Sequence, residues 1–528
     1  MAEHMTRSLG DLLAYMDREQ LVLPEIQRDF IWDRRSVIKL FDSMYRGMPI
    51  GHMLVWKARQ AVQPKGFGNR RPPKAPHKFD GFFGYLLDGQ QRLTAVSRVR
   101  DADDDFPLQF CVAPEERDGE AVFTWRTPRT RNAVWFKTVA ELMDPRFKII
   151  QYLDVLRGEH GVPDEKAEAI RKEVERIQLI LKYDIGVTIF ESEDYREATE
   201  LFVRFNSTGR RLRKADLIMA ELSNAVPGLR GAEFASLRSR YREFPFTAPF
   251  LVQCLLAFQT SRLSTKTRDP WGQFTDKDIR AGWRQIESAV GQVVSFLTGT
   301  VGWKKLSSLP SINALIPLIF VVAHGVPFGH SEREVARRWL HLTTTRFLFS
   351  GAVNTTLDRL IRKCAARPSV KALWNATPKA SVRPLKAADF QSSRISGPGM
   401  ALVSSMFSAN GARDWKDLDR KLDGSVVGKN AQLQVHHFFP RALLLKHGRT
   451  GEWINTLGNY TLLSAETNLN VGTEEPATYM ERLSVSEDQL CAQAIPRDRD
   501  LWRVSRYEKF IVEREKLLAV QANEYLGA

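Results

Sequence analysis

Residues 434–440 read QVHHFFP, and residues 457–472 read LGNYTLLSAETNLNVG. Apolar residues flank the two histidines, so the first stretch predicts a short strand that ends at His436 and His437. Neighbouring residues of a strand point to opposite faces, so one histidine can bind a metal while the other faces a separate reaction partner. The letters GNYTLL predict a second strand, and the polar turn or helix start after it carries Asn468. Together the two stretches predict strand, long loop, strand and helix.

These side chains suit the hydrolysis of a phosphodiester, which needs a base to activate water and a cation to absorb charge on the leaving oxygen. His437 suits the base because imidazole titrates near neutrality. His436 and Asn468 suit an incompletely coordinated divalent ion, whose other positions take water and phosphate oxygens. Asn459 can hold the histidine-bearing loop by bonding to its backbone.

The pattern His-His-x-x-Pro followed by Gly-Asn-x-x-Leu-Leu resembles the HNH, or ββα-metal, nuclease motif, in the variant with Asn at the last metal position. The resemblance covers about 40 residues. It implies that His437 is the general base, that His436 and Asn468 bind Mg²⁺ or Mn²⁺, and that Asn459 is the structural residue of the catalytic motif. The alternative is two strand histidines satisfied by backbone bonds, together with two loop asparagines.

Composition bounds the rest of the chain. Its 528 residues predict two to four domains, and 43% hydrophobic residues are ordinary for a globular protein. The net charge of +15 favours a polyanionic partner, nucleic acid before membrane, over a merely basic protein. The N-terminus lacks a signal peptide, and the apolar run Ala314–Ala323 is too short to cross a bilayer. Widely spaced cysteines predict reduced intracellular thiols and a cytoplasmic protein; they are Cys111, Cys254, Cys364 and Cys491.

The N-terminal part alternates helix and strand signals. Residues 34–45 have helical spacing, 52–56 and 82–87 read as strands, and 93–99 as a helix. The turn DGQQR at 88–92 therefore lies between a strand and a helix, where backbone N–H groups form an anion site. Its Arg92 adds a bidentate phosphate fork, while Asp88 can hold a metal or orient that arginine.

The strings PEIQR at 24–28 and DGQQRLT at 88–94 resemble the ParB-like N-terminal domain of GmrSD- and SspE-type DNA restriction proteins. A third string, LFVRFNSTGRRLRKADLI at 201–218, matches that family's Phe-x-x-x-Asn-[ST]-x-Gly-x-x-Leu segment; alone it reads equally as a capped helix start. The resemblance implies binding and hydrolysis of GTP or another nucleoside triphosphate, without a P-loop. The residues it implies for that site are Gln27, Arg28, Asp88, Gly89, Gln90, Gln91, Arg92, Thr94 and Asn206.

We therefore expect an α+β multidomain protein. Residues 1–220 form a ParB-like α/β nucleotide-binding and sensor domain, and 221–375 form an all-α region, because strand signals are absent there. Residues 376–528 form the ββα-metal nuclease domain. The prolines and serines of 365–399 predict a flexible junction in front of it.

These resemblances imply an anti-phage restriction protein that couples nucleotide hydrolysis, and sensing of a DNA modification, to metal-dependent nicking or cleavage of double-stranded DNA. Some members of this group attack glucosylated cytosine DNA, and SspE-like members work alongside phosphorothioate modification. Two other classes stay open: a ParB-like DNA-binding regulator with an inactive nuclease fold, and an RNA-cleaving toxin. The presence of all four motif residues argues against the first, and the basic charge allows the second. The modification sensed, the preferred nucleotide, the metal and the oligomeric state stay open.

Overall fold

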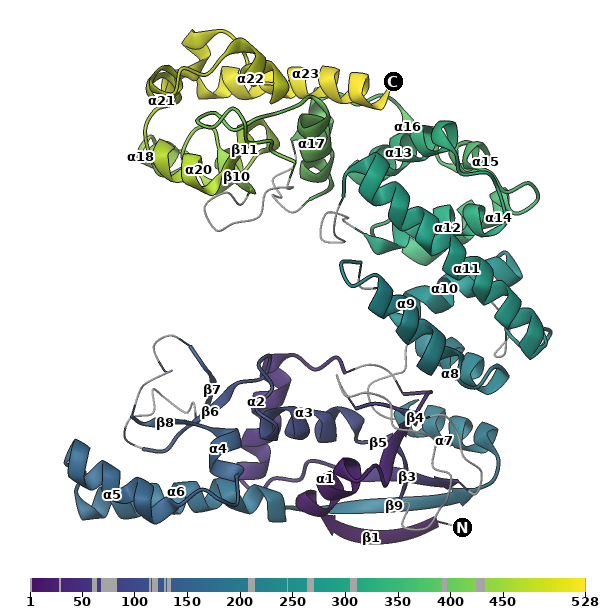
Figure 1. Ribbon diagram of the computed structural model, residues 1–528, viewed down its shortest axis with the longest axis vertical. Helices are drawn as coiled ribbons and strands as arrows, with labels where there is room; N and C mark the ends of the chain where they lie inside the picture. The colour runs from purple at the N-terminus through teal and green to yellow at the C-terminus, as the bar shows by residue number, and fades with distance from the viewer. Residues whose placement is uncertain are drawn as a thin grey trace. The chain divides into compact units, whose positions relative to one another are not determined.

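The chain folds into two compact units, Met1–Ala235 and Ser236–Ala528, each taken by itself below (Figure 1). The structure is a computed structural model. It describes residues 2–27, 30–58, 64–67, 83–113, 115, 122–127, 130, 134–207, 214–244, 246–263, 270–303, 311–391, 397–423 and 433–527.

A six-stranded mixed sheet is the centre of the first unit, with the strand order β1-β9-β3-β5-β2-β4. Strand β2 runs parallel to β5, and β3 runs parallel to β9, while the other neighbours are antiparallel. The strands are β1 (Ala2–Ser8), β2 (Leu21–Pro24), β3 (Met53–Ala58), β4 (Pro64–Lys65), β5 (Gly84–Asp88) and β9 (Asp184–Ser192).

Alternate residues of this sheet enter two different cores, as the pleat requires. Val55 and Leu86 pack into the core that α1, α2, α3 and α6 complete. Leu54 and Tyr85 face the other side, where Phe202 of α7 covers them. The sheet is therefore buried on both faces, which confirms an α/β architecture for the N-terminal part. The helices are α1 (Leu9–Asp17), α2 (Arg34–Tyr45), α3 (Gln90–Arg100), α4 (Val139–Met143), α5 (Ile149–His160), α6 (Asp164–Gln178), α7 (Tyr195–Ser207) and α8 (Lys214–Ala225).

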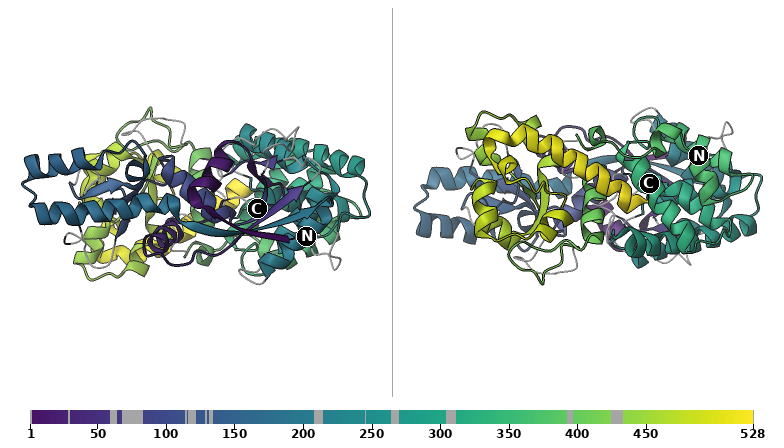
Figure 2. Two further views of the ribbon diagram at one scale, coloured as in Figure 1. Left: turned by 90° about the horizontal axis from the view of Figure 1, so that it is seen from below. Right: turned by 90° about the horizontal axis from the view of Figure 1, so that it is seen from above.

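A second, three-stranded sheet has the order β7-β6-β8. Its strands are β6 (Leu108–Cys111), β7 (Phe123–Trp125) and β8 (Phe136–Thr138). Beside it, α5 and α6 form a pair of neighbouring helices (Figures 1 and 2). The helix of the 201–218 stretch runs to Ala225, so the boundary expected at residue 220 falls inside α8.

The second unit begins with helices only, as far as the structure describes residues 236–391. Most of the apolar run Ala314–Ala323 forms α12 (Ile316–Ala323), and all eight residues of this helix are buried. The other elements, counted from the end of the first unit, are η3 (Leu229–Phe234), α9 (Ala235–Arg240), α10 (Ala248–Thr260), α11 (Asp276–Phe296), η4 (Leu297–Val301), η6 (Ile312–Leu315), α13 (His330–Thr345), α14 (Val353–Cys364), α15 (Val370–Ala376), α16 (Lys379–Val382) and η7 (Ala387–Phe390).

The flexible junction expected at 365–399 is folded in its described part, 365–391 and 397–399. Leu385 and Phe390 are buried in one core with the C-terminal helix, and Asn523 of that helix bonds both the N–H and the C=O of Leu385. The prolines do not prevent this, because Pro378 precedes α16 and Pro398 occupies its helix's first turn, positions that proline tolerates.

The C-terminal part contains an antiparallel pair of strands, β10 (Leu433–His437) and β11 (Tyr460–Ser464), with α20 (Ala465–Val471) directly after the second strand. The final helix begins at Tyr507, and Trp502 before it ends a separate 3-10 turn and donates its indole N–H to Pro496 O. The remaining elements are α17 (Pro398–Ala409), α18 (Arg441–Lys446), α19 (Gly451–Ile454), η8 (Leu457–Asn459), α21 (Pro476–Arg482), α22 (Glu487–Ala492), η9 (Arg499–Trp502), η10 (Val504–Arg506) and α23 (Tyr507–Leu526). Helix α23 packs against α17 and η8, and its full length is visible in Figure 2.

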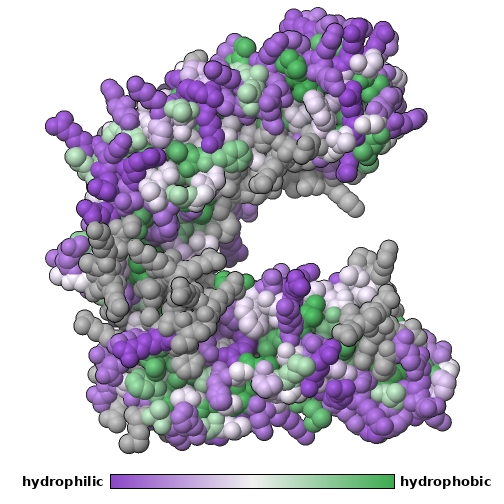
Figure 3. Space-filling model, turned by 180° about the vertical axis from the view of Figure 1, so that it is seen from behind, coloured by the Kyte–Doolittle hydropathy of each residue, from purple (hydrophilic) through white to green (hydrophobic). Residues whose placement is uncertain are grey.

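Hydrophilic side chains cover most of the face that Figure 3 shows. Within the described residues, no helix combines the length and the apolar character that crossing a bilayer requires.

Candidate functional site

The two adjacent histidines end β10 and point to different surroundings. His436 pairs with Thr461 and His437 with Tyr460 across the hairpin. His436 is 5% exposed and lies near the rings of Trp415 and Tyr479, whereas His437 is half-buried. This is the opposite-face arrangement that strand geometry predicts.

Asn468 lies beside His436, although 32 residues separate them. Ser464 caps α20 by accepting a hydrogen bond from Thr467 N, and the helix then places Asn468 one turn further on. Its Oδ1 lies 2.6 Å from His436 Nδ1. Its Nδ2 donates to Gln434 Oε1 at 2.7 Å, so β10 holds both ends of the amide.

His437 is oriented by a residue outside the predicted set. Its Nε2 lies 3.1 Å from Asn455 Oδ1, and its ring lies 5.0 Å from that of Tyr460. Because an amide oxygen only accepts, Nε2 carries the proton in this arrangement and Nδ1 keeps the lone pair that a general base uses. The sequence offered no signal for Asn455, which lies in the long loop between the strands.

Asn459 holds that loop in place, and it is completely buried. Its Oδ1 accepts from Phe439 N at 2.8 Å. Its Nδ2 donates to the carbonyl oxygens of Phe439 and Ile454 at 3.2 and 3.1 Å. One amide therefore ties together the residues after β10 and the residues before β11.

Two further buried charges support the hairpin, and sequence reasoning missed both. Asp414 accepts from Ser464 N at 2.8 Å and from the Thr467 hydroxyl. Burial alone would raise the pKa of Asp414, but hydrogen bonds from Thr467 and Ser464 outweigh it and hold the pKa below its usual value. The carboxylate therefore stays ionised and fixes the start of α20.

Arg514 of α23 is the second buried charge. It donates to the carbonyl oxygens of Gly458, Tyr460 and Gln493 at 3.1, 2.6 and 3.2 Å. Burial lowers its pKa to about 9. The final helix thus braces the strand that leads to Asn468.

His436 and Asn468 fit a divalent cation. Their Nδ1 and Oδ1 atoms lie within hydrogen-bond distance, so Nδ1–H donates to the amide oxygen here, and a bound ion would take the place of that proton between the two atoms. Burial lowers the pKa of His436 to about 4, which keeps the imidazole neutral as a metal ligand must be. Its buried Nε2 has no hydrogen-bond partner in the described part of the chain. No group of three His, Cys, Asp or Glu side chains with metal-binding geometry occurs among the described residues, so an ion here would rely on the asparagine oxygen and on water.

The DGQQR turn of the first unit has the predicted form. Strand β5 ends at Asp88, and α3 begins at Gln90 with Gly89 as its N-cap at φ 101°. A Cβ at Gly89 would lie 2.7 Å from Met53 Cγ, so both the left-handed backbone and the close approach require glycine. The start of α3 is thus the place where the sequence predicts an anion site, and anion binding there stays a prediction.

The Arg92 guanidinium was expected to bind phosphate, but in the structure it bonds to groups of the chain itself. Its Nη1 donates to Ile50 O and its Nη2 to His52 O, both at 2.6 Å, and Nη2 also pairs with Asp88 at 2.7 Å. Burial lowers the pKa of Arg92, and the Asp88 carboxylate acts against that effect. Asp88 therefore orients Arg92, one of its two expected roles, and the guanidinium clamps the loop before β3.

The glutamines of the expected nucleotide set also bond within the chain. Gln27 Nε2 donates to the carbonyl oxygens of Leu86 and Leu87 at 2.9 and 2.6 Å. Gln91 Oε1 accepts from Ile31 N at 2.9 Å, and Gln90 lies beside it, 3.4 Å away. These bonds hold the segment after PEIQR against β5 and α3.

Three residues of the expected nucleotide set remain. The structure describes the side chain of Thr94 but not those of Arg28 and Asn206. The Thr94 hydroxyl is buried in α3 and has no hydrogen-bond partner among the described residues. Arg28 lies outside the described residues, and Asn206 lies in α7 with its side chain outside the description. Phe202, one turn before Asn206, packs against β5, so α7 is at least brought to this strand.

Comparison with known proteins agrees with this α/β unit. Residues 9–223 match the family described as "GmrSD restriction endonuclease, N-terminal domain". Residues 9–223 form a GmrSD N-terminal domain. The family resemblance drawn from PEIQR and DGQQRLT is thereby confirmed for this part of the chain. The matched residues include β5, α3 and α7, which carry Asp88, the start of α3 and Asn206, and the segment after β2 that holds Gln27.

A relative also spans both units. The uncharacterized protein MJ0686 of Methanocaldococcus jannaschii is 22% identical to this chain over an alignment of 528 positions, which covers 91% of this chain and 87% of the relative.

Proposed function

We propose that this chain is a DNA restriction protein that nicks or cuts double-stranded DNA at the histidine–asparagine site. Its GmrSD domain binds and hydrolyses a nucleoside triphosphate and senses a DNA modification, with phosphorothioate and glucosylated cytosine as the candidates. The coarse part of this proposal, a restriction endonuclease role, follows the description of the family that residues 9–223 match.

The observation that carries the nuclease proposal is that one strand–strand–helix unit holds all four predicted side chains. It brings Asn468 Oδ1 to 2.6 Å from His436 Nδ1 although 32 residues separate them. His437 on the opposite face keeps a lone pair on Nδ1, and Asn459 fixes the loop between them.

The residues of this chain divide the work of phosphodiester hydrolysis. A bound divalent ion would supply charge stabilisation to the leaving oxygen, with His436 and Asn468 as its protein ligands. His437 takes the proton from the attacking water at Nδ1 while Asn455 holds the opposite edge of its ring. The net charge of +15 favours approach of a polyanion.

The nucleotide proposal rests on the start of α3. Backbone N–H groups at Gln90 and Gln91 can bind phosphate oxygens, and Thr94 offers a buried hydroxyl that has no partner among the described residues. Because Arg92 and Gln27 are committed to backbone carbonyls, we assign them to building the turn rather than to holding phosphate.

The nuclease proposal is tested with the full chain on supercoiled plasmid in Mg²⁺ or Mn²⁺. His437→Ala should lower nicking by about 100-fold or more, the usual worth of a general base, and EDTA should abolish it. His447→Ala is the matched control, because His447 is an exposed histidine on the same loop. Nicking by His437→Ala at the wild-type rate would overturn the assignment.

Substrate class is tested in parallel with duplex DNA and RNA of the same sequence. Cleavage of DNA with RNA left intact is expected, whereas the reverse would favour an RNA-cleaving toxin. Phage plating on hosts with and without DNA phosphorothioation then tests which modification state matters.

A further inference from the structure

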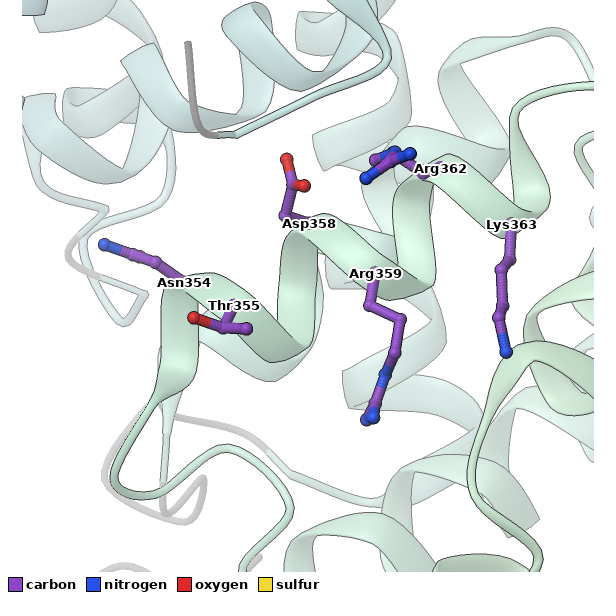
Figure 4. Close-up of a pocket in the computed structure, with 6 residues that line it drawn as sticks. All are labelled: Asn354, Thr355, Asp358, Arg359, Arg362 and Lys363. Atoms are coloured by element: carbon purple, nitrogen blue, oxygen red, sulfur yellow. The ribbon is translucent and has the colours of Figure 1, made fainter. Parts of the chain in front are cut away.

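Helix α14 has two sharply different faces. Leu357, Leu360, Ile361 and Cys364 are buried in the helical core of the second unit, each at most 1% exposed. The opposite half of the helix carries polar side chains, which are Asn354, Thr355, Asp358, Arg359, Arg362 and Lys363. These six residues line a hollow of about 570 Å³, and Figure 4 shows them along the helix.

The three cations of this face have no acidic counterpart. Arg359, Arg362 and Lys363 are exposed, and none of them forms a hydrogen bond or ion pair with any residue that the structure describes. Figure 4 shows Arg359 and Lys363 projecting to the same side, as their i, i+4 spacing requires. Elsewhere in the chain, exposed arginines such as Arg204 and Arg482 pair with glutamates. The α14 face therefore keeps its positive charge available.

Among the lining residues that the structure describes, Asp358 is the only acid, and it does not neutralise the three cations. Asp358 points away from Arg359 and Lys363 in Figure 4, and its Oδ1 accepts from Leu263 N at 2.8 Å. Its carboxylate thus anchors the end of α10 to α14. Three cations and one anchored carboxylate leave a net charge of +2 on the lining.

We propose that this face of α14 is a docking surface for the phosphate backbone of double-stranded DNA. The proposal rests on the proposed nuclease function for its choice of partner. Arg359 and Lys363 are about 6 Å apart along the helix axis, which is close to two base steps of one strand at about 3.4 Å each. Asn354 and Thr355 add neutral donors of the kind that position a duplex without reading its sequence.

The surface is separable from the fold, which makes it testable. Its cations bond to none of the described residues, so replacing them removes no contact that holds the helix, while the buried face stays intact. We expect Arg359→Gln, Arg362→Gln and Lys363→Gln together to leave the melting temperature unchanged.

The measurement is binding of the full chain to a duplex of about 30 base pairs in EDTA, followed from about 50 to about 200 mM salt. Each lost phosphate contact lowers the magnitude of the slope of log K against log salt by about 0.9. The triple variant should therefore lose about 2 to 3 units of slope. The matched control removes equal charge from three other exposed cations: Lys277→Gln, Arg284→Gln and Lys379→Gln.

The outcomes separate this inference from the nuclease proposal. A slope lowered in the α14 variant but not in the control supports the surface, even if the chain never nicks plasmid. An unchanged slope, an equal loss in the control, or tighter binding of duplex RNA than of DNA overturns the surface, even if plasmid is nicked at His437.

Discussion

At the scale of single residues, the scaffold around the candidate sites depends on side chains that bond to buried backbone groups. Asn459 satisfies one N–H and two C=O groups inside the protein. Arg514 and Arg92 each satisfy two or more carbonyl oxygens. Irregular backbone that is buried must find such partners, because an unpaired group costs about 1–3 kcal/mol. The polar residues near the histidines are therefore first a scaffold for them.

The first prediction concerns Asn459. Asn459→Ala leaves three buried backbone groups unpaired and should lower the free energy of unfolding of this unit by about 2–4 kcal/mol. The rate of plasmid nicking should fall as well, because the loop that carries Asn455 loses its hydrogen bonds to the Asn459 amide. Urea denaturation and plasmid nicking measure the two effects. His437→Ala is the contrasting variant, since it should lose activity with little loss of stability. Equal stability of Asn459→Ala and wild type would contradict this account.

The second prediction concerns His341, a fully buried histidine of α13. Neither ring nitrogen has a hydrogen-bond partner in the described residues. The rings of Trp303 and Tyr525 pack against it. Burial first, and then the nearby Arg337 charge, lower its pKa from 6.5 to about 3. In the unfolded chain this histidine is therefore protonated below about pH 6.5, whereas in the folded chain it is protonated only below about pH 3.

It follows that this histidine's contribution to stability is full above pH 6.5 and is lost as the pH falls from 6.5 toward 3. His341→Phe keeps an aromatic ring and should remove about one proton from the acid dependence, up to about 1.4 kcal/mol per pH unit. Urea melts of both proteins from neutral to acid pH measure the difference, which cancels the shared contributions of His436 and His437. Parallel curves would show that His341 is not the titrating group.

At the scale of elements, local sequence patterns predicted which segments form strands and helices. They did not predict which distant elements pack against those segments. The 34–45 spacing predicted α2 (Arg34–Tyr45) correctly, and the polar turn after GNYTLL became α20. The prediction that residues 365–391 are flexible was wrong. Prolines indicate where a helix can start, but they do not indicate whether other parts of the chain bury the segment. Leu385 and Phe390 are buried by α23, more than a hundred residues later in the chain.

The third prediction concerns the start of α20. Asp414→Asn replaces an ionised acceptor with an amide whose NH₂ faces a donor, at Ser464 N or at the Thr467 hydroxyl. We expect a loss of about 2 kcal/mol and reduced nicking, because Asn468 would shift relative to His436. Asp417→Asn is the control, since Asp417 is a nearby acid paired at the surface with Arg420. Thermal melting and nicking rates should separate the two variants, and identical behaviour would exclude a positioning role for Asp414.

At the scale of the whole molecule, we propose that nucleotide at the GmrSD domain controls the proposed nuclease site on the same chain, because an uncontrolled nuclease would damage its host. Nucleotide can exert such control only through different affinities for two states of the protein. Thr94 allows a clean test. Thr94→Val removes a buried hydroxyl that has no partner in the described chain, so folding should be unaffected or slightly stabilised.

The fourth prediction uses this variant in the intact protein. Adding nucleotide should change the rate of plasmid nicking, in either direction, and Thr94→Val should weaken both phosphate release and that change. Arg92→Ala should also lower nucleotide turnover, but through loss of stability, which thermal melting would reveal. A nicking rate that nucleotide never alters would refute coupling while leaving each separate site intact.

The sequence by itself determined the elements and the residues of the motifs, since both depend on neighbours a few positions apart. The alternation around His436 and His437, the turn at Gly89 and the cap at Ser464 are local features. Only the tertiary structure decided which groups hold these residues in place. Asp414 lies 50 residues before Ser464, and Arg514 lies 54 residues after Tyr460.

The physical reason is that a buried polar group can be satisfied by any partner the fold brings near, and no spacing rule specifies that partner. For the same reason Arg92 looked like a phosphate ligand in sequence. Its fork suits phosphate and backbone carbonyls equally, and the fold brought Ile50 and His52 to it.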